Sequence, residues 1–211
     1  SQRQFEKVLN RCIASEQMDV NEYNEFMLEN GAPDSYLFLN EKPPIVDQIL
    51  NATRDGKGSI KVKDLLAISP DALKLAAQQG GKDFKIIVDT TTNGKKVDVR
   101  LTFTPSETTK GVIVAAYTDE TLADYYKEKF GKELAVVDFM QEGKFGTTIK
   151  VTANVNLKNL NTDKLRFYSI NRTTNKYAEI ENPNYSIDKN GYLVFYTDRG
   201  NTVLITDTKL K

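Results

Sequence analysis

Hydrophobic positions repeat with two different spacings along this 211-residue chain, and the spacing changes near residue 55. Before that point the spacing is helical, with apolar residues at i, i+3, i+4, i+7 and i+8. The residues that follow this pattern are Phe5, Val8, Leu9, Cys12 and Ile13. A second helix is predicted to begin at Asp19, with Glu22 three positions later as in a capping box, and to end before Gly31. We therefore expect a small helical N-terminal segment, residues 1–55, whose boundary falls within the polar, turn-rich stretch 51–59.

From residue 56 onward the pattern is typical of strands. The stretch 84–105 holds two strands around the turn TTTNGKK, which predicts a β-hairpin. The alternating apolar positions of its second strand are Val97, Val99, Leu101 and Phe103. The other predicted strands are residues 59–62, 111–117, 134–140, 147–155, 164–170, 176–180, 191–197 and 201–206. Many short strands at regular intervals, with turn residues between them, predict an antiparallel β-sandwich.

One or two short helices are predicted within this β region. Ser69-Pro70-Asp71 has the cap and the first-turn proline of a helix that runs to Gly80-Gly81. A second helix is predicted to begin at Asp119 or Thr121 and to stop at Gly131. The predicted fold is therefore mainly β with a helical N-terminal segment, and residues 56–211 form the sandwich module. Two sub-modules, divided near residue 132, are an alternative organisation.

Charge and composition remove several classes of function. The 29 basic and 29 acidic residues balance and form no long block, so we expect no nucleic-acid partner. The chain has no histidine, which removes imidazole general bases, Ser-His and Cys-His pairs and the commonest zinc ligand. Its only cysteine, Cys12, cannot form an intrachain disulfide and is expected to be buried. Paired carboxylates of the glycosidase type are the remaining catalytic option, but no pair has a distinctive setting. We expect no catalytic residue, no cofactor and no metal.

The sequence carries no run of about 18 apolar residues, so we expect no membrane insertion. It also lacks a signal sequence and begins at Ser1. We expect a mature fragment of an exported protein, extracellular or at the cell surface, whose signal peptide has been removed. Neither a heptad run nor a long apolar edge is evident, and a monomer is expected.

Two stretches imitate calcium-binding loops. Residues 188–191, Asp-Lys-Asn-Gly, fail the EF-hand spacing because Tyr192 and Leu193 stand where an oxygen ligand and glycine are needed. Asn-Gly between strand-like residues instead predicts a tight hairpin turn. Residues 53–64 fit better, but Lys57 would place an ammonium group where calcium needs an oxygen. We interpret residues 188–191 as a turn and expect no calcium site at residues 53–64.

Tyrosines gather in the last quarter of the chain, at Tyr168, Tyr177, Tyr185, Tyr192 and Tyr196. An exposed strip of tyrosines stacks well on sugar rings, whereas tyrosine also favours strands for reasons of packing alone. The candidate ligand contacts are Tyr168, Tyr177, Tyr192 and Tyr196. Alternation places Tyr192, Val194 and Tyr196 on one face of their strand and Leu193, Phe195 and Thr197 on the other. Since both faces carry large apolar groups, this strand is predicted to be central and covered on both sides.

The order of strands and turns from Gly58 to Leu210 resembles a known group of modules. The stretches that carry this resemblance are residues 58–103, 139–155 and 165–205, the last ending in a tyrosine-rich hairpin. They are similar to Ig-like β-sandwich modules of secreted and surface proteins of Gram-positive gut bacteria. This resemblance implies an exported, non-enzymatic module.

Taken with that resemblance, the sequence predicts a structural or adhesive module that contacts an unknown protein or glycan. Its variable loops, which are free to contact a partner, are predicted at 90–96, 141–147 and 171–176. The alternative is a carbohydrate-binding module that uses a tyrosine-rich face of the C-terminal half.

Overall fold

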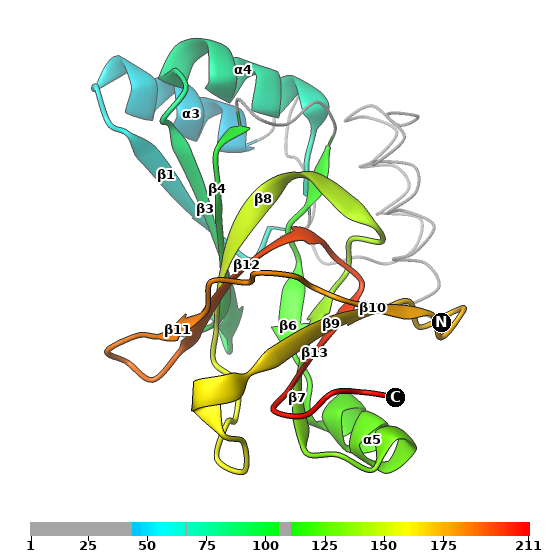
Figure 1. Cartoon of the computed structure of the whole chain (residues 1–211). Coiled ribbons are helices and arrows are strands. Elements are labelled where there is room, and N and C mark those ends of the chain that lie inside the picture. Colours follow the sequence, from blue (N-terminus) through cyan, green and yellow to red (C-terminus); the bar gives the residue numbers. More distant parts are fainter. Residues whose placement is uncertain (1–43, 66, 106–110) are drawn as a thin grey trace.

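The computed structural model describes residues 44–65, 67–105 and 111–211, and this part of the chain is mainly β (Figure 1). The two helices predicted before residue 31, and Cys12, lie outside the described residues. The helices are α3 (Pro44–Arg54), α4 (Pro70–Gly80), α5 (Glu120–Phe130) and the 3-10 helix η3 (Thr162–Lys164). The first strands are β1 (Ser59–Lys63), β2 (Ala67–Ile68), β3 (Lys85–Thr92), β4 (Lys96–Phe103), β5 (Val112–Ile113), β6 (Ala116–Thr118) and β7 (Leu134–Phe139). The remaining strands are β8 (Lys144–Ala153), β9 (Arg166–Ile170), β10 (Tyr177–Glu179), β11 (Ser186–Ile187), β12 (Leu193–Arg199) and β13 (Thr202–Thr206).

Both helices predicted within the β region are confirmed, together with their caps. The Ser69 hydroxyl accepts a hydrogen bond from the backbone N–H of Ala72 at 3.2 Å, at the start of α4. The Asp119 carboxylate does the same for Leu122 at 2.8 Å, at the start of α5. Gly131 ends α5 in the left-handed region, with φ of 63°, where glycine pays no steric penalty.

The strands form three sheets. The six-stranded sheet has the order β1-β3-β4-β8-β12-β11, and the five-stranded sheet has the order β10-β9-β13-β7-β6. Strands β2 and β5 form a separate pair. All pairings are antiparallel except that of β1 with β3, which is parallel. The prediction of a single strand at 111–117 is therefore wrong. This stretch forms two strands, of which β5 pairs with β2 and β6 joins the edge of the five-stranded sheet.

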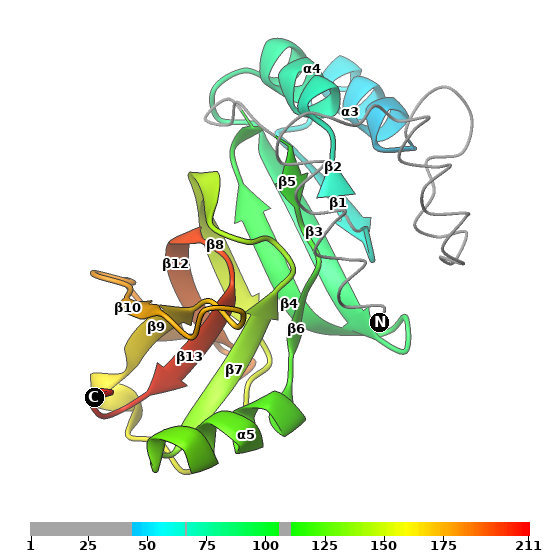
Figure 2. The ribbon, with the colours of Figure 1, turned by 90° about the vertical axis from the view of Figure 1, so that its right-hand side faces the viewer.

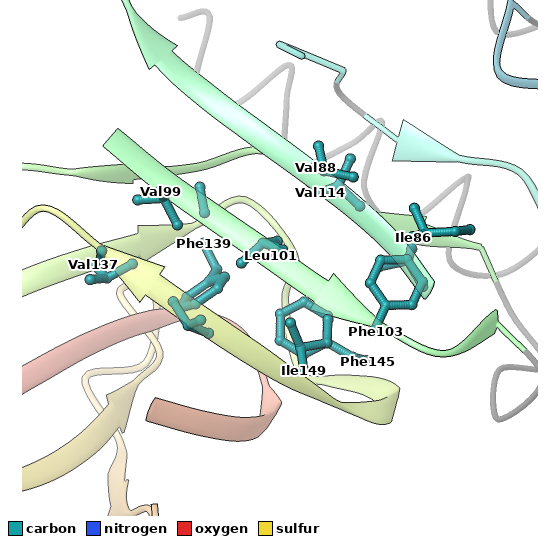
Figure 3. Packing of buried hydrophobic residues seen from close by; sticks show 14 of the residues in the cluster. Ile86, Val88, Val99, Leu101, Phe103, Val114, Val137, Phe139, Phe145 and Ile149 are labelled. Atoms are coloured by element: carbon teal, nitrogen blue, oxygen red, sulfur yellow. The ribbon is translucent and has the colours of Figure 1, made fainter. Parts of the chain in front are cut away.

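One hydrophobic cluster draws on both larger sheets and on α3 and α4, and Figure 3 shows part of it. The ring centroids of Phe139 and Phe145 are 5.6 Å apart, and those of Phe167 and Phe195 are 4.9 Å apart. Each of these pairs joins one residue of the five-stranded sheet to one of the six-stranded sheet. Helix α3 contributes Ile49, which is fully buried, so the last helix of the expected 1–55 segment shares this core.

A second, smaller cluster lies between α5 and the other face of the five-stranded sheet. Its members include Leu122, Tyr126, Leu134, Val136, Tyr168 and Leu204. Helices α3 and α4 lie side by side at one end of the molecule and α5 at the opposite end (Figures 1 and 2). The five-stranded sheet is thus covered on both faces, which explains why every residue of β7 is buried.

The hairpin of β3 and β4 is confirmed, but its predicted alternation fails at the first position. The register shifts so that Thr90 lies opposite Val99 while Thr91 lies opposite Val97, which leaves Asp98 as an extra residue. Val97 is only half-buried as a result. The Asp98 carboxylate accepts hydrogen bonds from the backbone N–H and the hydroxyl of Thr118, at 2.9 and 2.6 Å, and so ties β4 to β6.

None of the helices in the described residues has the length and apolar character needed to cross a membrane.

Candidate functional site

The loop at residues 188–191 is a hairpin turn, as predicted. Asp188 Oδ1 accepts from the backbone N–H groups of Asn190 and Tyr192, both at 2.9 Å, and Asp188 N–H donates to the Tyr192 carbonyl. Asn190 and Gly191 were predicted as a pair that tolerates positive φ, but within this turn only Gly191 has a positive φ, of 81°. The Asp188 carboxylate is thus engaged by its own turn.

The acidic residues of the second calcium-like stretch have separate partners. Asp55 is 3.4 Å from the Arg54 guanidinium, just after α3. Both Asp64 oxygens accept from Thr91, at 2.8 Å from its N–H and 2.7 Å from its hydroxyl. Among the residues that the structure describes, no group of three or more histidine, cysteine, aspartate or glutamate residues could hold a metal ion.

Two of the four candidate tyrosines pack against α5. Tyr168 is 3% exposed, and its hydroxyl accepts from the backbone N–H of Leu210 at 3.3 Å. The Tyr177 ring lies 5.5 Å from that of Phe130 and 6.0 Å from that of Tyr168, in edge-to-face geometry. These rings fill the space between α5 and the five-stranded sheet.

The other two candidates lie at the six-stranded sheet, Tyr196 within β12 and Tyr192 directly before it. The predicted alternation on β12 is confirmed, because Leu193 and Phe195 are fully buried while Tyr196 points away from them. The Tyr192 hydroxyl donates to the Val97 carbonyl at 2.9 Å. Tyr196 is 37% exposed, so the prediction that both faces of this strand are covered is wrong for this residue. The four tyrosines therefore form no common platform.

The described residues instead bring two hollows together around one loop, residues 171–176, which joins β9 to β10. The Asn171 N–H donates to the Lys176 carbonyl at 2.9 Å, and the Asn175 N–H donates to the Asn171 carbonyl at 2.7 Å. Asn171 Oδ1 also accepts from the backbone N–H groups of Thr173 and Thr174, at 2.9 and 3.1 Å. These bonds fix the backbone of the loop in one compact conformation.

The first hollow, which we call the tyrosine hollow, lies between this loop and the start of α5 and has a volume of about 360 Å³. Its lining residues are Asp119, Thr121, Leu122, Tyr125, Tyr126, Arg172 and Asn175. Tyr125 is 56% exposed, whereas its neighbour Tyr126 is 1% exposed. The two rings are in edge-to-face contact at 5.0 Å, so the buried ring supports the exposed one.

A buried carboxylate anchors the arginine of the tyrosine hollow. The Asp138 side chain is 4% exposed, and its Oδ2 lies 3.4 Å from a guanidinium nitrogen of Arg172. The hydroxyl of Thr202 donates to the other oxygen, Oδ1, at 2.8 Å. Because Asp138 is held by β7 and its neighbour β13, it fixes the position of the Arg172 guanidinium.

The second hollow, the basic hollow, lies on the other side of the loop and has a volume of about 250 Å³. Its lining residues are Gly143, Lys144, Ser169, Asn171, Lys176, Tyr177, Ala178, Arg199 and Asn201. Three of them are cations and none is a carboxylate. Asp198, which does not line the hollow, is 3.0 Å from the Arg199 guanidinium and offsets one of these charges.

Titration shifts among the described residues belong to structural ion pairs. Arg166 donates two hydrogen bonds to Glu179, at 2.8 and 3.1 Å, and these bonds lower the pKa of the Glu179 carboxyl. Arg100 makes a similar pair with Asp89, and this hydrogen bonding raises the pKa of the Arg100 guanidinium. Neither pair lines a hollow named above.

Part of the region around the two hollows was predicted from the sequence. Of the three loops predicted to contact a partner, 141–147 and 171–176 contribute to the hollows, whereas 90–96 contributes to neither. Tyr125 and Arg172 were not predicted. The signal for Tyr125 was present, because adjacent tyrosines on a helix point about 100° apart and a one-sided core can bury only one of them.

Comparison of the chain with protein-family models, with curated proteins and with solved structures finds no match.

Proposed function

We propose that this chain is a non-catalytic adhesive module of a bacterial protein that is exported to the cell surface or the medium. In this proposal the two larger sheets form an Ig-like β-sandwich, and the loops at one region of it contact a partner. The shared hydrophobic cluster supports the sandwich arrangement, since residues of both sheets meet in it. The export and the bacterial setting rest on the resemblance stated above.

The observation that carries the proposal is the meeting of separate loops at one place. The basic hollow is lined by Gly143 and Lys144, where the predicted 141–147 loop enters β8. It is also lined by Asn171 and Lys176 of loop 171–176, and by Arg199 and Asn201, where β12 turns into β13. Loop 171–176 also borders the tyrosine hollow. Loops that are positioned by a packed scaffold and converge on a hollow are the usual place for recognition.

Carbohydrate binding remains the second candidate, and it is favoured by one observation. The tyrosine hollow combines an exposed aromatic ring with polar side chains, which is the composition that suits a sugar. This candidate uses α5 and loop 171–176 rather than the tyrosines of β9, β10 and β12.

Both candidates are tested by screening the intact chain against a glycan array and an array of cell-surface and matrix proteins. The test variant is Lys144→Glu combined with Lys176→Glu, which reverses two charges in the basic hollow. The matched control is Lys61→Glu with Lys150→Glu, two exposed lysines of the six-stranded sheet that line neither hollow.

We expect a specific hit that the test variant weakens and the control retains, if the ligand contacts the basic hollow. A ligand that binds in the tyrosine hollow is instead recognised by its weaker binding to Tyr125→Ala. Binding that survives substitutions in both hollows, or the absence of any hit, would refute the proposed loop contact.

A further inference from the structure

The tyrosine hollow contains one aromatic ring that serves no role in the described core. Tyr125 is 56% exposed, while Leu122 and Tyr126 from the same helix are buried. An exposed aromatic face is attractive to the C–H groups of a sugar ring, because both surfaces are apolar and flat. Its edge contact with Tyr126 limits the rotation of the ring and reduces the entropy lost when a ligand stacks on it.

Two of the polar groups around this ring, Arg172 and Asp119, are positioned by contacts within the fold. Asp138 holds Arg172, whose guanidinium has five N–H donors, of which the contact with Asp138 uses one. Asn175 is exposed at the turn of the loop, with φ of 59°, and its backbone N–H is bonded within that loop. Asp119 caps α5 through Oδ1, and the carboxylate retains further acceptor sites. Planar groups of this kind, with neighbouring donors and acceptors, match the vicinal hydroxyls of a sugar.

Charge and size narrow the ligand class. The lining of the tyrosine hollow contains one carboxylate, Asp119, and one guanidinium, Arg172, and the guanidinium is paired with Asp138, so the site has no excess positive charge. Such a site gives no electrostatic preference for an acidic ligand, in contrast to the basic hollow across the loop. Its volume of about 360 Å³ is near the lower end of the ~300–1,000 Å³ typical of small-molecule sites, which suits one or two rings.

We propose that the tyrosine hollow binds a neutral sugar ring, stacked on Tyr125 and hydrogen bonded through Arg172, Asn175 and Asp119. This inference rests on the proposed function, because it takes loop 171–176 as the contact loop, and it names the ligand class. The basic hollow is not part of this site.

The test is a ligand-detected NMR titration of the intact chain with three probes: neutral methyl hexosides, a neutral N-acetylhexosamine and glucuronate. The variants are Tyr125→Ala, which removes the ring, and Tyr125→Phe, which keeps it. Tyr196→Ala is the matched control, because it removes an exposed tyrosine that lines neither hollow. Thermal melts establish that all variants are folded, as expected for exposed positions.

We expect a neutral sugar to bind and Tyr125→Ala to weaken it about tenfold or more, while Tyr125→Phe stays within roughly threefold and Tyr196→Ala is unchanged. Equal binding by Tyr125→Ala and the unchanged chain would overturn the inference. The inference would also be overturned if only glucuronate bound and Lys144→Gln abolished this binding. That result would place the ligand in the basic hollow and leave the proposed function intact. If no sugar binds but a surface protein does, the inference fails and the adhesive proposal stands. If neither binds, both fail.

Discussion

The ion pair between Asp89 and Arg100 allows a sharp test of how burial sets the strength of an interaction. Arg100 Nε and a terminal nitrogen donate to the two Asp89 oxygens at 2.6 and 2.9 Å. The Asp89 side chain is 2% exposed, whereas that of Arg100 is 35% exposed. Arg100→Ala therefore removes both of these hydrogen bonds and leaves a buried carboxylate without its cation.

The expected loss is about 2–4 kcal/mol of unfolding free energy. Breaking a fully buried pair costs about 3–5 kcal/mol. The value here is lower because the exposed part of Arg100 leaves an opening through which water can reach Asp89. Arg199 provides a matched control, since its side chain is also 35% exposed but its partner, Asp198, is 48% exposed. Arg199→Ala is expected to cost less than about 1 kcal/mol, as for surface pairs.

The assay is urea unfolding at pH 7 followed by circular dichroism, with the free energy taken from linear extrapolation. With a slope of about 2 kcal/mol per M, Arg100→Ala should lower the midpoint by about 1–2 M. In a double-mutant cycle, Asp89→Asn with Arg100→Gln should cost less than the sum of the two single changes. Equal losses for Arg100→Ala and Arg199→Ala, or an additive cycle, would refute the argument that burial of the carboxylate determines the effect.

Three further changes have defined outcomes. Phe195→Ala empties a fully buried site in the cluster shared by both sheets and should cost about 3–5 kcal/mol in urea unfolding, so a loss below 1 kcal/mol would contradict this packing. Gly200→Ala places a Cβ against the carbonyl oxygen of Gln141, and should lower stability by about 1–3 kcal/mol in a thermal melt; an unchanged melt would mean that the backbone adjusts freely. Arg166 lowers the pKa of Glu179, so this carboxylate adds stability above its unfolded pKa and loses it as pH falls through the folded pKa. Glu179→Gln should therefore cost up to about 1 kcal/mol at neutral pH and nothing in acid, and a loss that is the same at both pH values would contradict the linkage.

Features set by neighbouring residues could be predicted from the sequence. The caps of α4 and α5 depend on a side chain and a backbone group three positions apart. Ser69 and Asp119, which are typical N-cap residues, therefore predict both helix starts. The hairpin of β3 and β4 and the turn at 188–191 are likewise local, because their strands follow each other directly along the chain. Alternation also gave the buried face of β12 correctly.

Features that depend on distant partners could not be predicted. The extra residue in β4 exists where Asp98 turns to bind Thr118, and nothing near Asp98 in the sequence signals that contact. The stretch 111–117 reads as one apolar strand, yet its two halves pair with different strands. Tyr168 and Tyr196 look alike in sequence, and only the position of α5 decides that one is covered and the other exposed.

The same long-range packing holds loop 171–176 in a defined position, which the proposed contact requires. Strand β9 leads into the loop, and it belongs to both clusters, through Phe167 on one face and Tyr168 on the other. Strand β10, which leaves the loop, is a short edge strand, and among the described strands it pairs only with β9. The loop is therefore held by one strand that is fixed by the whole core, by its own hydrogen bonds, and by the contact of Arg172 with buried Asp138. Because these contacts already order the loop backbone, the proposed ligand would lose less entropy on binding than it would with a flexible loop.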